Sequence, residues 1–415
     1  MTKADRTGEH APSRRADFAS TRFAAPSGSA AERGAHAVRA LFVVNSLNVG
    51  GSETKTVRVV NSLLGLGFRA GIAYLNEPSF LLESLNPNVP RWNLNRCGKF
   101  SFNALRRLRS LIWNERPNVV LAVNLYPALY VSLAAPAAPY ALRTVASINT
   151  SQFPARRAWL PMFYRPFLQR FDHIVYGCES QRSAWLPRLR CRTRSVVIYN
   201  GVDIEHFAPA RSTESMAGAK RRLGIAPDAF VIGAVGRLAP EKNHEVLIDA
   251  TTDLRRCLID AHLLLVGDGD MRRKLEERAA EEGISAHVTF AGMQSDVRLA
   301  LSAIDVFVLP STHVETFSNA ALEAMAMGIP VVLSRIGGAQ EMIEEGVEGV
   351  TLSTEELAER LTPTLVSLQR DASQRERMGR AARERVVQQF SFQGMVEQYA
   401  ALIDDRVRPI EEQTP

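Results

Sequence analysis

The stretch Leu309–Gly338, LPSTHVETFSNAALEAMAMGIPVVLSRIGG, decides the fold of this chain. A short apolar run, Val306–Leu309, predicts a buried strand that ends where the stretch begins, and a loop then leads to a helix that starts near Ser318. A second apolar run, Pro330–Leu333, predicts the next strand. A strand, a helix and a strand in this order form a βαβ unit, which predicts a parallel sheet covered by helices.

The same alternation continues toward both ends of the chain. Further strands are predicted at Leu41–Leu47, Gly71–Leu75, Val119–Asn124, Thr144–Ile148, His173–Tyr176, Val196–Tyr199, Val231–Val235, Leu263–Val266 and Val288–Phe290. The rhythm breaks near Asp203, and the polar segment Pro209–Lys220 is interpreted as the edge of a linker. We therefore expect two doubly wound, Rossmann-like α/β domains, residues 38–204 and 205–389, which face each other across a deep cleft.

Composition excludes several classes of protein. The chain has 415 residues, 46% hydrophobic and 23% charged, which is ordinary for a soluble globular protein. No apolar run approaches the ~18 residues of a membrane span, and we expect no signal peptide. The four cysteines form no C-x-x-C pair, which argues against a disulfide scaffold or a zinc ribbon. We expect a cytoplasmic protein, with residues 1–37 as a disordered basic arm.

The charge is divided unevenly along the chain. Residues 1–200 carry 27 Lys and Arg against 10 Asp and Glu, whereas residues 201–415 carry 23 against 34. A basic half is typical of a protein that meets an anionic surface, although a general compositional bias toward Arg gives the same count. No helix-turn-helix, RNP or zinc pattern accompanies it, so we expect no nucleic-acid partner.

Two glutamates follow the strand that opens the quoted stretch. Glu315 lies on the predicted loop, Glu323 lies on the second turn of the helix, and the free amides of Phe317–Ala320 form an anion site at the helix N-terminus. Acids beside a phosphate are favourable where they accept hydrogen bonds from hydroxyl groups, which a nucleotide sugar supplies. The alternative is that both glutamates are exposed helix-end acids.

A second cluster follows the predicted strand Val231–Val235. Gly236 permits a sharp turn there, and Arg237 and Lys242 flank a turn that contains proline. The two cations can converge on one anion, such as the diphosphate of a leaving nucleotide. The alternative is a solvated basic loop.

Two glycine-rich loops join strands to helices, at Gly50–Glu53 and at Val266–Asp270. The second loop is not a dinucleotide-binding fingerprint, because Arg272 stands where the third glycine would be. Asp268 and Asp270 are interpreted as caps of the turn rather than metal ligands. We expect no metal.

Taken together, these motifs resemble one family. The runs YNGVD (199–203), GRLAPEKN (236–243), VGDGD (266–270) and ETFSNAALEAMAMGIPVV (315–332), with two glycines downstream, resemble those of retaining family 4 glycosyltransferases, which have the two-domain GT-B fold. Residues 38–408 fit that architecture. The resemblance implies a last helix, within residues 390–408, that crosses back onto the first domain.

The resemblance also implies roles for individual residues. Arg237, Lys242 and Glu315 are implied to be catalytic, Glu323 to bind the ribose, and Glu53 to lie on the acceptor side. The remaining residues implied to bind the donor are Gly50, Gly51, Asn149, Gly236, Gly267, Gly269, Met293, Thr316, Phe317, Ser318 and Asn319. The donor is a nucleoside-diphosphate sugar, and no cofactor is implied.

One position departs from the family pattern. Many relatives have a histidine at the end of the strand Thr144–Ile148, where it touches the donor sugar, and this chain has Asn149. An amide donates and accepts hydrogen bonds but does not titrate near neutral pH, so Asn149 is not a general base.

The segment FPARRAWLPMFYRPFLQRF, residues 153–171, interleaves basic and aromatic residues. Its membrane-surface candidates are Arg156, Arg157, Trp159, Phe163 and Arg165. Such interleaving is typical of a helix at a lipid interface, although a core-packed helix pair with outward arginines gives the same pattern. Pro161 and Pro166 predict that the helix is interrupted. We expect the basic half to dock on the anionic inner leaflet of the membrane.

The sequence thus predicts a hexosyltransferase. It would move a hexose with retention from a nucleoside-diphosphate sugar to a glycan or lipid-linked acceptor in bacterial surface polysaccharide or lipopolysaccharide biosynthesis. The alternatives are a nucleotide-sugar epimerase or a phosphorylase on the same architecture, and a non-catalytic partner that binds nucleotide or glycan.

Overall fold

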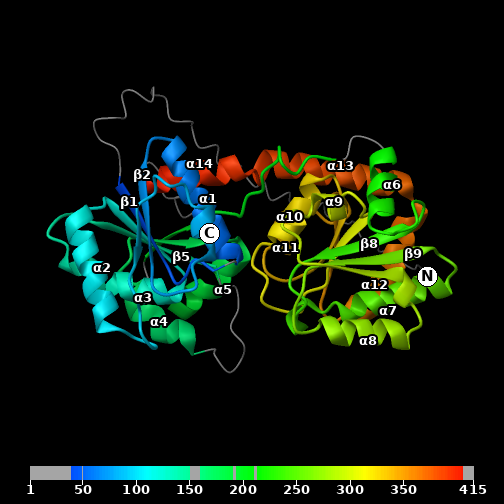
Figure 1. Ribbon diagram of the computed structural model, residues 1–415, viewed down its shortest axis with the longest axis horizontal. Helices are drawn as coiled ribbons and strands as arrows, with labels where there is room; N and C mark the ends of the chain where they lie inside the picture. Colours follow the sequence, from blue (N-terminus) through cyan, green and yellow to red (C-terminus); the bar gives the residue numbers. More distant parts are fainter. Residues whose placement is uncertain (1–38, 49, 150–158, 190–192, 210–212, 405–415) are drawn as a thin grey trace, which may run out of the picture.

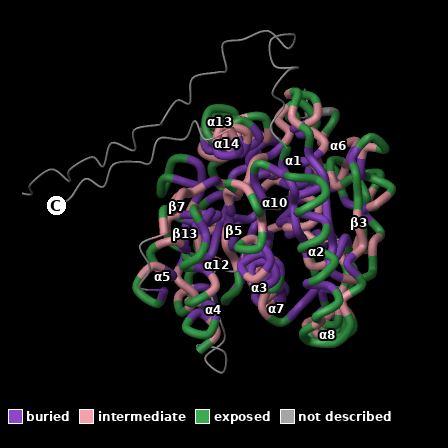
Figure 2. The backbone as a smooth tube through the Cα atoms, turned by 90° about the vertical axis from the view of Figure 1, so that its left-hand side faces the viewer, coloured by how far each residue is buried: buried purple, intermediate pink, exposed green. Residues whose placement is uncertain are grey.

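The chain folds into two α/β lobes (Figure 1). The structure is a computed structural model, and it describes residues 39–48, 50–149, 159–189, 193–209 and 213–404. The predicted basic arm, residues 1–37, lies outside the described residues. Each lobe is built on one parallel sheet, of seven strands in the N-terminal lobe and six in the C-terminal lobe. In Figure 2 the strands are buried, whereas outer helices such as α2 and α8 expose one face.

The N-terminal lobe has the strand order β3-β2-β1-β4-β5-β6-β7. Its strands are β1 (Arg39–Val44), β2 (Arg69–Tyr74), β3 (Arg91–Asn93), β4 (Val119–Val123), β5 (Arg143–Ile148), β6 (His173–Tyr176) and β7 (Arg194–Val197). Its α-helices are α1 (Gly51–Gly65), α2 (Phe102–Glu115), α3 (Leu125–Ala134), α4 (Leu160–Leu168) and α5 (Glu179–Leu189), with short 3-10 helices at Phe80–Ser84 and Ala135–Ala137.

The C-terminal lobe has the order β10-β9-β8-β11-β12-β13. Its strands are β8 (Phe230–Val235), β9 (Ala261–Val266), β10 (Val288–Gly292), β11 (Val306–Leu309), β12 (Val331–Ser334) and β13 (Gly349–Leu352). Its helices are α6 (Thr213–Arg222), α7 (Glu245–Arg256), α8 (Arg272–Glu281), α9 (Arg298–Leu301), α10 (Asn319–Ala326), α11 (Ala339–Met342), α12 (Leu357–Arg370) and α13 (Ala372–Gln389), with 3-10 turns at Pro240–Lys242 and Ser285–His287.

Both sheets follow one topology. In each, the first strand lies between the second and the fourth, so the chain reverses its winding direction beside β1 in one lobe and beside β8 in the other. Such switch points are where open parallel sheets bind ligands, outside the carboxyl ends of the strands. The predicted fold class, two doubly wound α/β units, is confirmed.

Three local predictions differ from the structure. The edge strands β3 and β13 were not predicted, because each is short and lacks a long apolar run. The segment interpreted as a linker edge contains helix α6 instead. A tertiary contact explains it: Lys220 is buried, and its ammonium binds Asp305 at 2.8 Å and the carbonyl of Ala229 at 2.9 Å.

The predicted interruption by Pro161 and Pro166 is also wrong, because α4 is continuous from Leu160 to Leu168. Pro161 lies in the first turn, where a backbone N–H has no partner within the helix to lose. Pro166 lies within the last turn, so the helix continues for only two residues beyond it.

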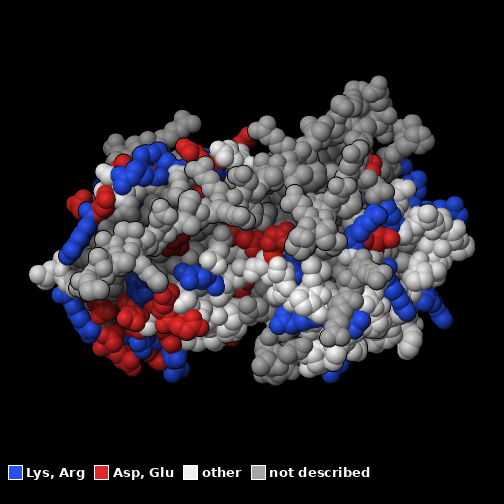
Figure 3. All heavy atoms as spheres, turned by 180° about the vertical axis from the view of Figure 1, so that it is seen from behind, with Lys and Arg blue, Asp and Glu red and all other residues white. Residues whose placement is uncertain are grey.

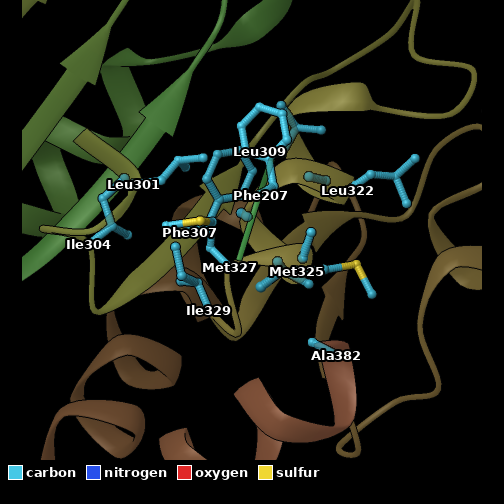
Figure 4. Packing of buried hydrophobic residues seen from close by; sticks show 14 of the residues in the cluster. Phe207, Leu301, Ile304, Phe307, Leu309, Leu322, Met325, Met327, Ile329 and Ala382 are labelled. Atoms are coloured by element: carbon cyan, nitrogen blue, oxygen red, sulfur yellow. The ribbon is translucent and has the colours of Figure 1, made fainter. Parts of the chain in front are cut away.

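The last two helices span both lobes (Figure 1). Helix α13 packs on the C-terminal lobe, where Ala382 joins the cluster around Phe207, Phe307 and Leu322 (Figure 4). The chain then turns at Ser391, whose hydroxyl caps α14 (Phe392–Ile403) by accepting from the amide of Gly394 at 3.1 Å. Residues Met395, Val396 and Tyr399 of α14 pack into the core of the N-terminal lobe, with Val57 and Val60 of α1.

Candidate active site

The loops at the carboxyl ends of the two sheets meet at the junction of the lobes. The hydroxyl of Thr316, on the loop after β11, donates to the backbone carbonyl of Asn149, at the end of β5, at 3.1 Å. The side chain of Asn200 donates to the carbonyl of Phe317 at 2.8 Å. The structure thus brings together Asn149 and the Thr316–Asn319 loop, which the family resemblance assigned to one site.

The loop after β11 carries an ion pair. The ammonium of Lys242 lies 2.5 Å from a carboxylate oxygen of Glu315, and about one fifth of each side chain is exposed. Val314, just before Glu315, has a φ of 61°. Positive φ is strained in a β-branched residue, and such strain often lies at functional sites. Ser311, fully buried beneath the loop, also faces the Glu315 carboxylate, at 3.4 Å.

Arg237 and Lys242 do not share a partner. The guanidinium of Arg237 lies 2.5 Å from Glu241, and 68% of the arginine side chain is exposed. The backbone amide of Thr312 donates to the carbonyl of Glu241 at 2.9 Å, which joins the loops after β8 and β11. The two cations therefore lie on connected loops, and each already has a carboxylate partner.

Helix α10 begins as predicted. Ser318 is its N-cap, and its hydroxyl accepts from the amide of Ala321 at 3.3 Å. Glu323 lies on the second turn, and burial raises the pKa of its carboxyl to about 7, against a smaller opposing effect of Arg58. A Cβ added to Gly51, at the start of α1, would lie 3.9 Å from the side-chain amide of Asn319. The N-termini of α1 and α10 therefore face each other across the junction.

Close backbone packing explains some of the predicted glycines. A Cβ on Gly267 would lie 2.0 Å from the carbonyl oxygen of Gly236, so the loops after β8 and β9 can approach only where a side chain is missing. Gly269 packs against the backbone of Leu238 in the same way. Gly267 also donates to the carbonyl of Gly292 at 2.8 Å, which places Met293, 83% exposed, beside this pair of loops.

The N-terminal lobe contributes a polar network around Asn149. Its side-chain oxygen accepts from Lys55 at 2.8 Å, and its side-chain nitrogen donates to Asn124 at 3.3 Å. Glu53 lies in the first turn of α1, just after Gly50 and Gly51, and accepts from Ser52 at 2.7 Å. Sequence reasoning missed Lys55 and Asn124, although a polar residue after a buried strand was a usable signal for Asn124.

A third missed residue is Glu341, in helix α11 of the C-terminal lobe. Its carboxylate accepts from the backbone amides of Glu179 and Ser180, each at 2.7 Å, and from the hydroxyl of Tyr199 at 2.9 Å. It thereby caps the N-terminus of α5 in the other lobe. An acid three residues after the glycine pair at 337–338 was its only signal in the sequence.

The basic and aromatic segment divides between core and surface. Tyr164 and Leu168 of α4 are buried, whereas Trp159, Met162 and Phe163 expose 55%, 69% and 51% of their surface. Arg156 and Arg157 lie outside the described residues, and Arg165 lies in the last turn of α4. Among the helices that the structure describes, none has the length and apolar character needed to cross a membrane.

The charged side chains are distributed as the sequence count suggests. In Figure 3, acidic side chains gather on the C-terminal lobe, at the left, whereas the visible charged side chains of the N-terminal lobe are mostly basic. Within the described ranges, no group of three or more His, Cys, Asp or Glu side chains is placed to hold a metal ion.

Two family models match this chain. "Glycosyl transferases group 1" matches residues 217–385, and "Glycosyltransferase Family 4" matches residues 49–206. The matched segments correspond to most of the C-terminal and N-terminal lobes, respectively, and together cover more than three quarters of the chain.

Individual relatives agree with the family models. A lipopolysaccharide core biosynthesis glycosyltransferase, LpsE of Rhizobium meliloti, is 34% identical over 44% of this chain and 52% of its own length. The chain thus spans about half of that relative. A putative glycosyltransferase, EpsF of Bacillus subtilis, is 28% identical over 75% of this chain and 83% of its own length. The crystal structure of Anabaena HepE in complex with UDP superimposes with a TM-score of 0.78 at 22% identity, over 89% of this chain and all of that one.

Proposed function

Because this chain belongs to the family 4 glycosyltransferases and has the GT-B fold, we propose that it transfers a hexose from a nucleoside-diphosphate sugar with retention of anomeric configuration. The observation that carries the proposal is the Lys242–Glu315 pair, which lies on the loops around the C-terminal switch point, next to the capped N-terminus of α10. A cation, a carboxylate and free helix amides at one point suit a sugar attached to a diphosphate.

The residues divide the work as follows. The donor diphosphate lies between Lys242, Arg237 and the first amides of α10. When it binds, the Lys242 ammonium exchanges Glu315 for a phosphoryl oxygen, and Glu315 is released to accept hydrogen bonds from the sugar hydroxyls. Glu323 accepts from the ribose, and the loops at Gly267 and Met293 border the base.

Sugar transfer then needs little proton abstraction by a protein side chain. The acceptor oxygen attacks the anomeric carbon on the face from which the diphosphate departs, so a new C–O bond forms as the old one breaks. The acceptor proton passes to the departing phosphoryl oxygen. Cations and helix amides stabilise the charge that develops on that oxygen, which is the main source of rate enhancement in such sites. Asn149 only positions groups, and no metal takes part.

We also propose the acceptor and the place of action. The relative from Rhizobium meliloti acts in lipopolysaccharide core biosynthesis, which supports a glycan or lipid-linked acceptor of a bacterial surface polysaccharide. The basic N-terminal lobe and the exposed residues Trp159, Met162 and Phe163 of α4 would rest on the anionic inner leaflet, from the cytoplasmic side.

A thermal-shift panel of nucleotide sugars tests the donor. Binding raises the unfolding temperature in proportion to ln(1 + [L]/Kd), so the true donor should exceed its isosteres. Lys242→Ala and Glu315→Ala should abolish sugar transfer from that donor while the circular dichroism spectrum stays that of the wild type. Transfer by either variant at a near-wild-type rate would show that the assigned roles are wrong.

Vesicle flotation tests the membrane contact. The wild type should float with vesicles that contain phosphatidylglycerol and not with pure phosphatidylcholine, and the double variant Trp159→Ser, Phe163→Ser should lose flotation. A matched control, Leu258→Ser, changes a side chain that is 95% exposed on the C-terminal lobe and should not affect flotation. Equal flotation on both lipids would remove the membrane from the proposal and leave the glycosyltransferase intact.

A further inference from the structure

Lys55 lies on the second turn of α1, and its ammonium is held at the junction of the lobes. It donates to the side-chain oxygens of Asn149 at 2.8 Å and Asn200 at 3.2 Å. Its aliphatic stem lines a small cavity beneath α1, together with Phe42 and Val59. The stem is thus packed while the charged end reaches the polar junction.

Among the residues that the structure describes, none balances the charge of Lys55. Both of its hydrogen-bond partners are neutral amides, and no carboxylate of the described residues lies within ion-pair distance of its ammonium. Lys242 and Arg237, in contrast, each face a glutamate. A half-buried ammonium without a counter-ion among the described residues is unfavourable, so its position at this junction points to a ligand that carries the missing negative charge.

The neighbours of Lys55 are held under strain. Asn124, at the end of β4, has φ 72° and ψ 174°, a conformation that is nearly restricted to glycine. In this conformation its side-chain oxygen accepts from the backbone and side-chain nitrogens of Asn149, at 3.2 and 3.3 Å, and its amide donates to Ser52. The strained residue thereby fixes the amide that holds the lysine.

Both asparagines that hold Lys55 also contact the Thr316–Asn319 loop. Asn149 accepts from the hydroxyl of Thr316 through its backbone carbonyl, and Asn200 donates to the carbonyl of Phe317. Thr316 and Phe317 connect Glu315 to the N-terminus of α10. The ammonium of Lys55 therefore lies on the N-terminal-lobe side of the place assigned above to the donor diphosphate.

We propose that Lys55 is a third cation for the donor, and that its ammonium binds a phosphoryl oxygen of the nucleoside diphosphate from the N-terminal lobe. The inference rests on the proposed function. An ammonium has three N–H donors, and two are used by Asn149 and Asn200, so one remains for the phosphate. Asn149 then acts as the residue that holds a cation, at the position where many relatives have a histidine.

Calorimetric titration with nucleoside diphosphates and with the matching nucleosides, UDP and GDP against uridine and guanosine, tests this assignment. Lys55→Gln keeps an N–H donor for the two asparagines but removes the charge. It should weaken binding of the diphosphate about tenfold to hundredfold, the expected effect of one charge-assisted hydrogen bond, and leave nucleoside binding unchanged. Lys55→Arg should recover part of the loss. The control Lys274→Gln alters a lysine of α8 that pairs with Glu245, and it should bind as the wild type does.

Wild-type diphosphate affinity in Lys55→Gln, or an equal loss for nucleoside and diphosphate, would overturn the assignment of Lys55. The proposed function would still stand if Lys242→Ala lost diphosphate affinity in the same assay. A wild-type protein that binds neither diphosphate would remove both. If Lys55→Gln does not fold, Asn149→Asp decides the question, because it places a carboxylate beside the ammonium. It should weaken diphosphate binding at least tenfold, and unchanged affinity would contradict the assignment.

Discussion

The two lobes share one strand order but treat charge differently at their switch points. In the C-terminal lobe, the cations Arg237 and Lys242 are paired with carboxylates of neighbouring loops. In the N-terminal lobe, Lys55 is held by two side-chain amides, and no carboxylate of the described part of the chain pairs with it. One topology therefore supports one site whose cations are paired and one site with a cation that no described carboxylate pairs with, because the residues that follow the strands, in loops and in the first turns of helices, carry the function.

The two lobes also differ in how the charged side chains on their surfaces are paired. The C-terminal lobe pairs many of its arginines internally, as in Arg278–Asp249 and Arg256–Glu282 between α7 and its neighbours. Residues 1–200 contain only 10 acids for 27 bases, so most cations of that half have no acid within the same half to pair with. Anionic ligands are therefore expected to meet the N-terminal lobe first.

The largest expected effect comes from breaking the charge balance of the C-terminal lobe. Lys242→Ala should lower the rate of sugar transfer by about 1000-fold, since a cation at the leaving group is lost. It should also destabilise that lobe by about 2 kcal/mol, because it leaves the largely buried Glu315 carboxylate without a cationic partner. The double variant Lys242→Ala, Glu315→Ala should regain the stability and not the rate. Recovery of the rate in the double variant would contradict a role of Lys242 at the diphosphate.

Acid should weaken the C-terminal lobe selectively. Burial lowers the pKa of His244, at the start of α7, and of His262, in β9, to about 4. Between pH 6.5 and 4 the unfolded chain binds protons that the folded lobe does not, so the free energy of unfolding falls as pH falls, by up to about 3 kcal/mol for His244. His244→Gln should remove about half of this pH dependence, because His262 contributes a shift of the same size.

The titration of Glu323 changes the free energy of unfolding in the opposite direction over part of this pH range. Because its folded pKa is raised to about 7, the folded lobe takes up a proton between pH 7 and 4.5 before the unfolded chain does, which stabilises the fold as pH falls.

Two spectroscopic probes separate the acid transitions of the two lobes. The tryptophans of the chain all lie in its N-terminal half, at Trp92, Trp113, Trp159 and Trp185. Tryptophan fluorescence therefore follows that lobe and circular dichroism follows both. Identical acid transitions by the two probes would show that the effect is not confined to the C-terminal lobe.

The contact between the lobes gives an intermediate effect. Glu341→Gln keeps the shape of the side chain but weakens three hydrogen bonds to the other lobe, which should cost about 2 kcal/mol of inter-lobe stability. Small-angle scattering should then report a larger radius of gyration, and KM for the donor should rise more than kcat falls. Glu344→Gln, on an exposed carboxylate nearby, is the control. An unchanged radius and KM would show that Glu341 does not hold the lobes together.

The smallest expected effect concerns the strained loop. Val314→Gly removes the penalty of a positive φ at a β-branched residue but adds freedom to the unfolded chain, so the net change in stability should be under about 1 kcal/mol. The loop that carries Glu315 becomes less ordered, so kcat should fall a fewfold. A decrease of more than about 2 kcal/mol in the free energy of unfolding, measured by urea denaturation, would mean that Val314 makes more packing contacts than an exposed side chain should.

Much of the fold follows from local sequence, since buried strands such as β8 and β11 consist of continuous apolar runs. The N-cap at Ser318 was also readable. What could not be predicted depends on partners distant in the chain. Lys55 meets Asn149 across 94 positions, and Glu341 meets Glu179 across 162. Helix α6 likewise depends on Asp305, 85 positions from Lys220. The hydrophobic periodicity of the sequence does not predict such distant contacts.

The turn at Ser391 constrains how the lobes can move. The chain passes between the lobes twice, at Gly201–Val202 and at Phe390–Ser391, and the amides of Val202 and Phe392 donate to the carbonyls of Phe390 and Val202, at 2.9 and 2.8 Å. A Cβ on Gly201 would lie 2.5 Å from the carbonyl oxygen of Ser391, so the two passages touch. Because the two connecting segments are hydrogen-bonded to each other, they act together as one hinge. We therefore expect any relative motion of the lobes to be a rotation about this point, because separation would break these contacts.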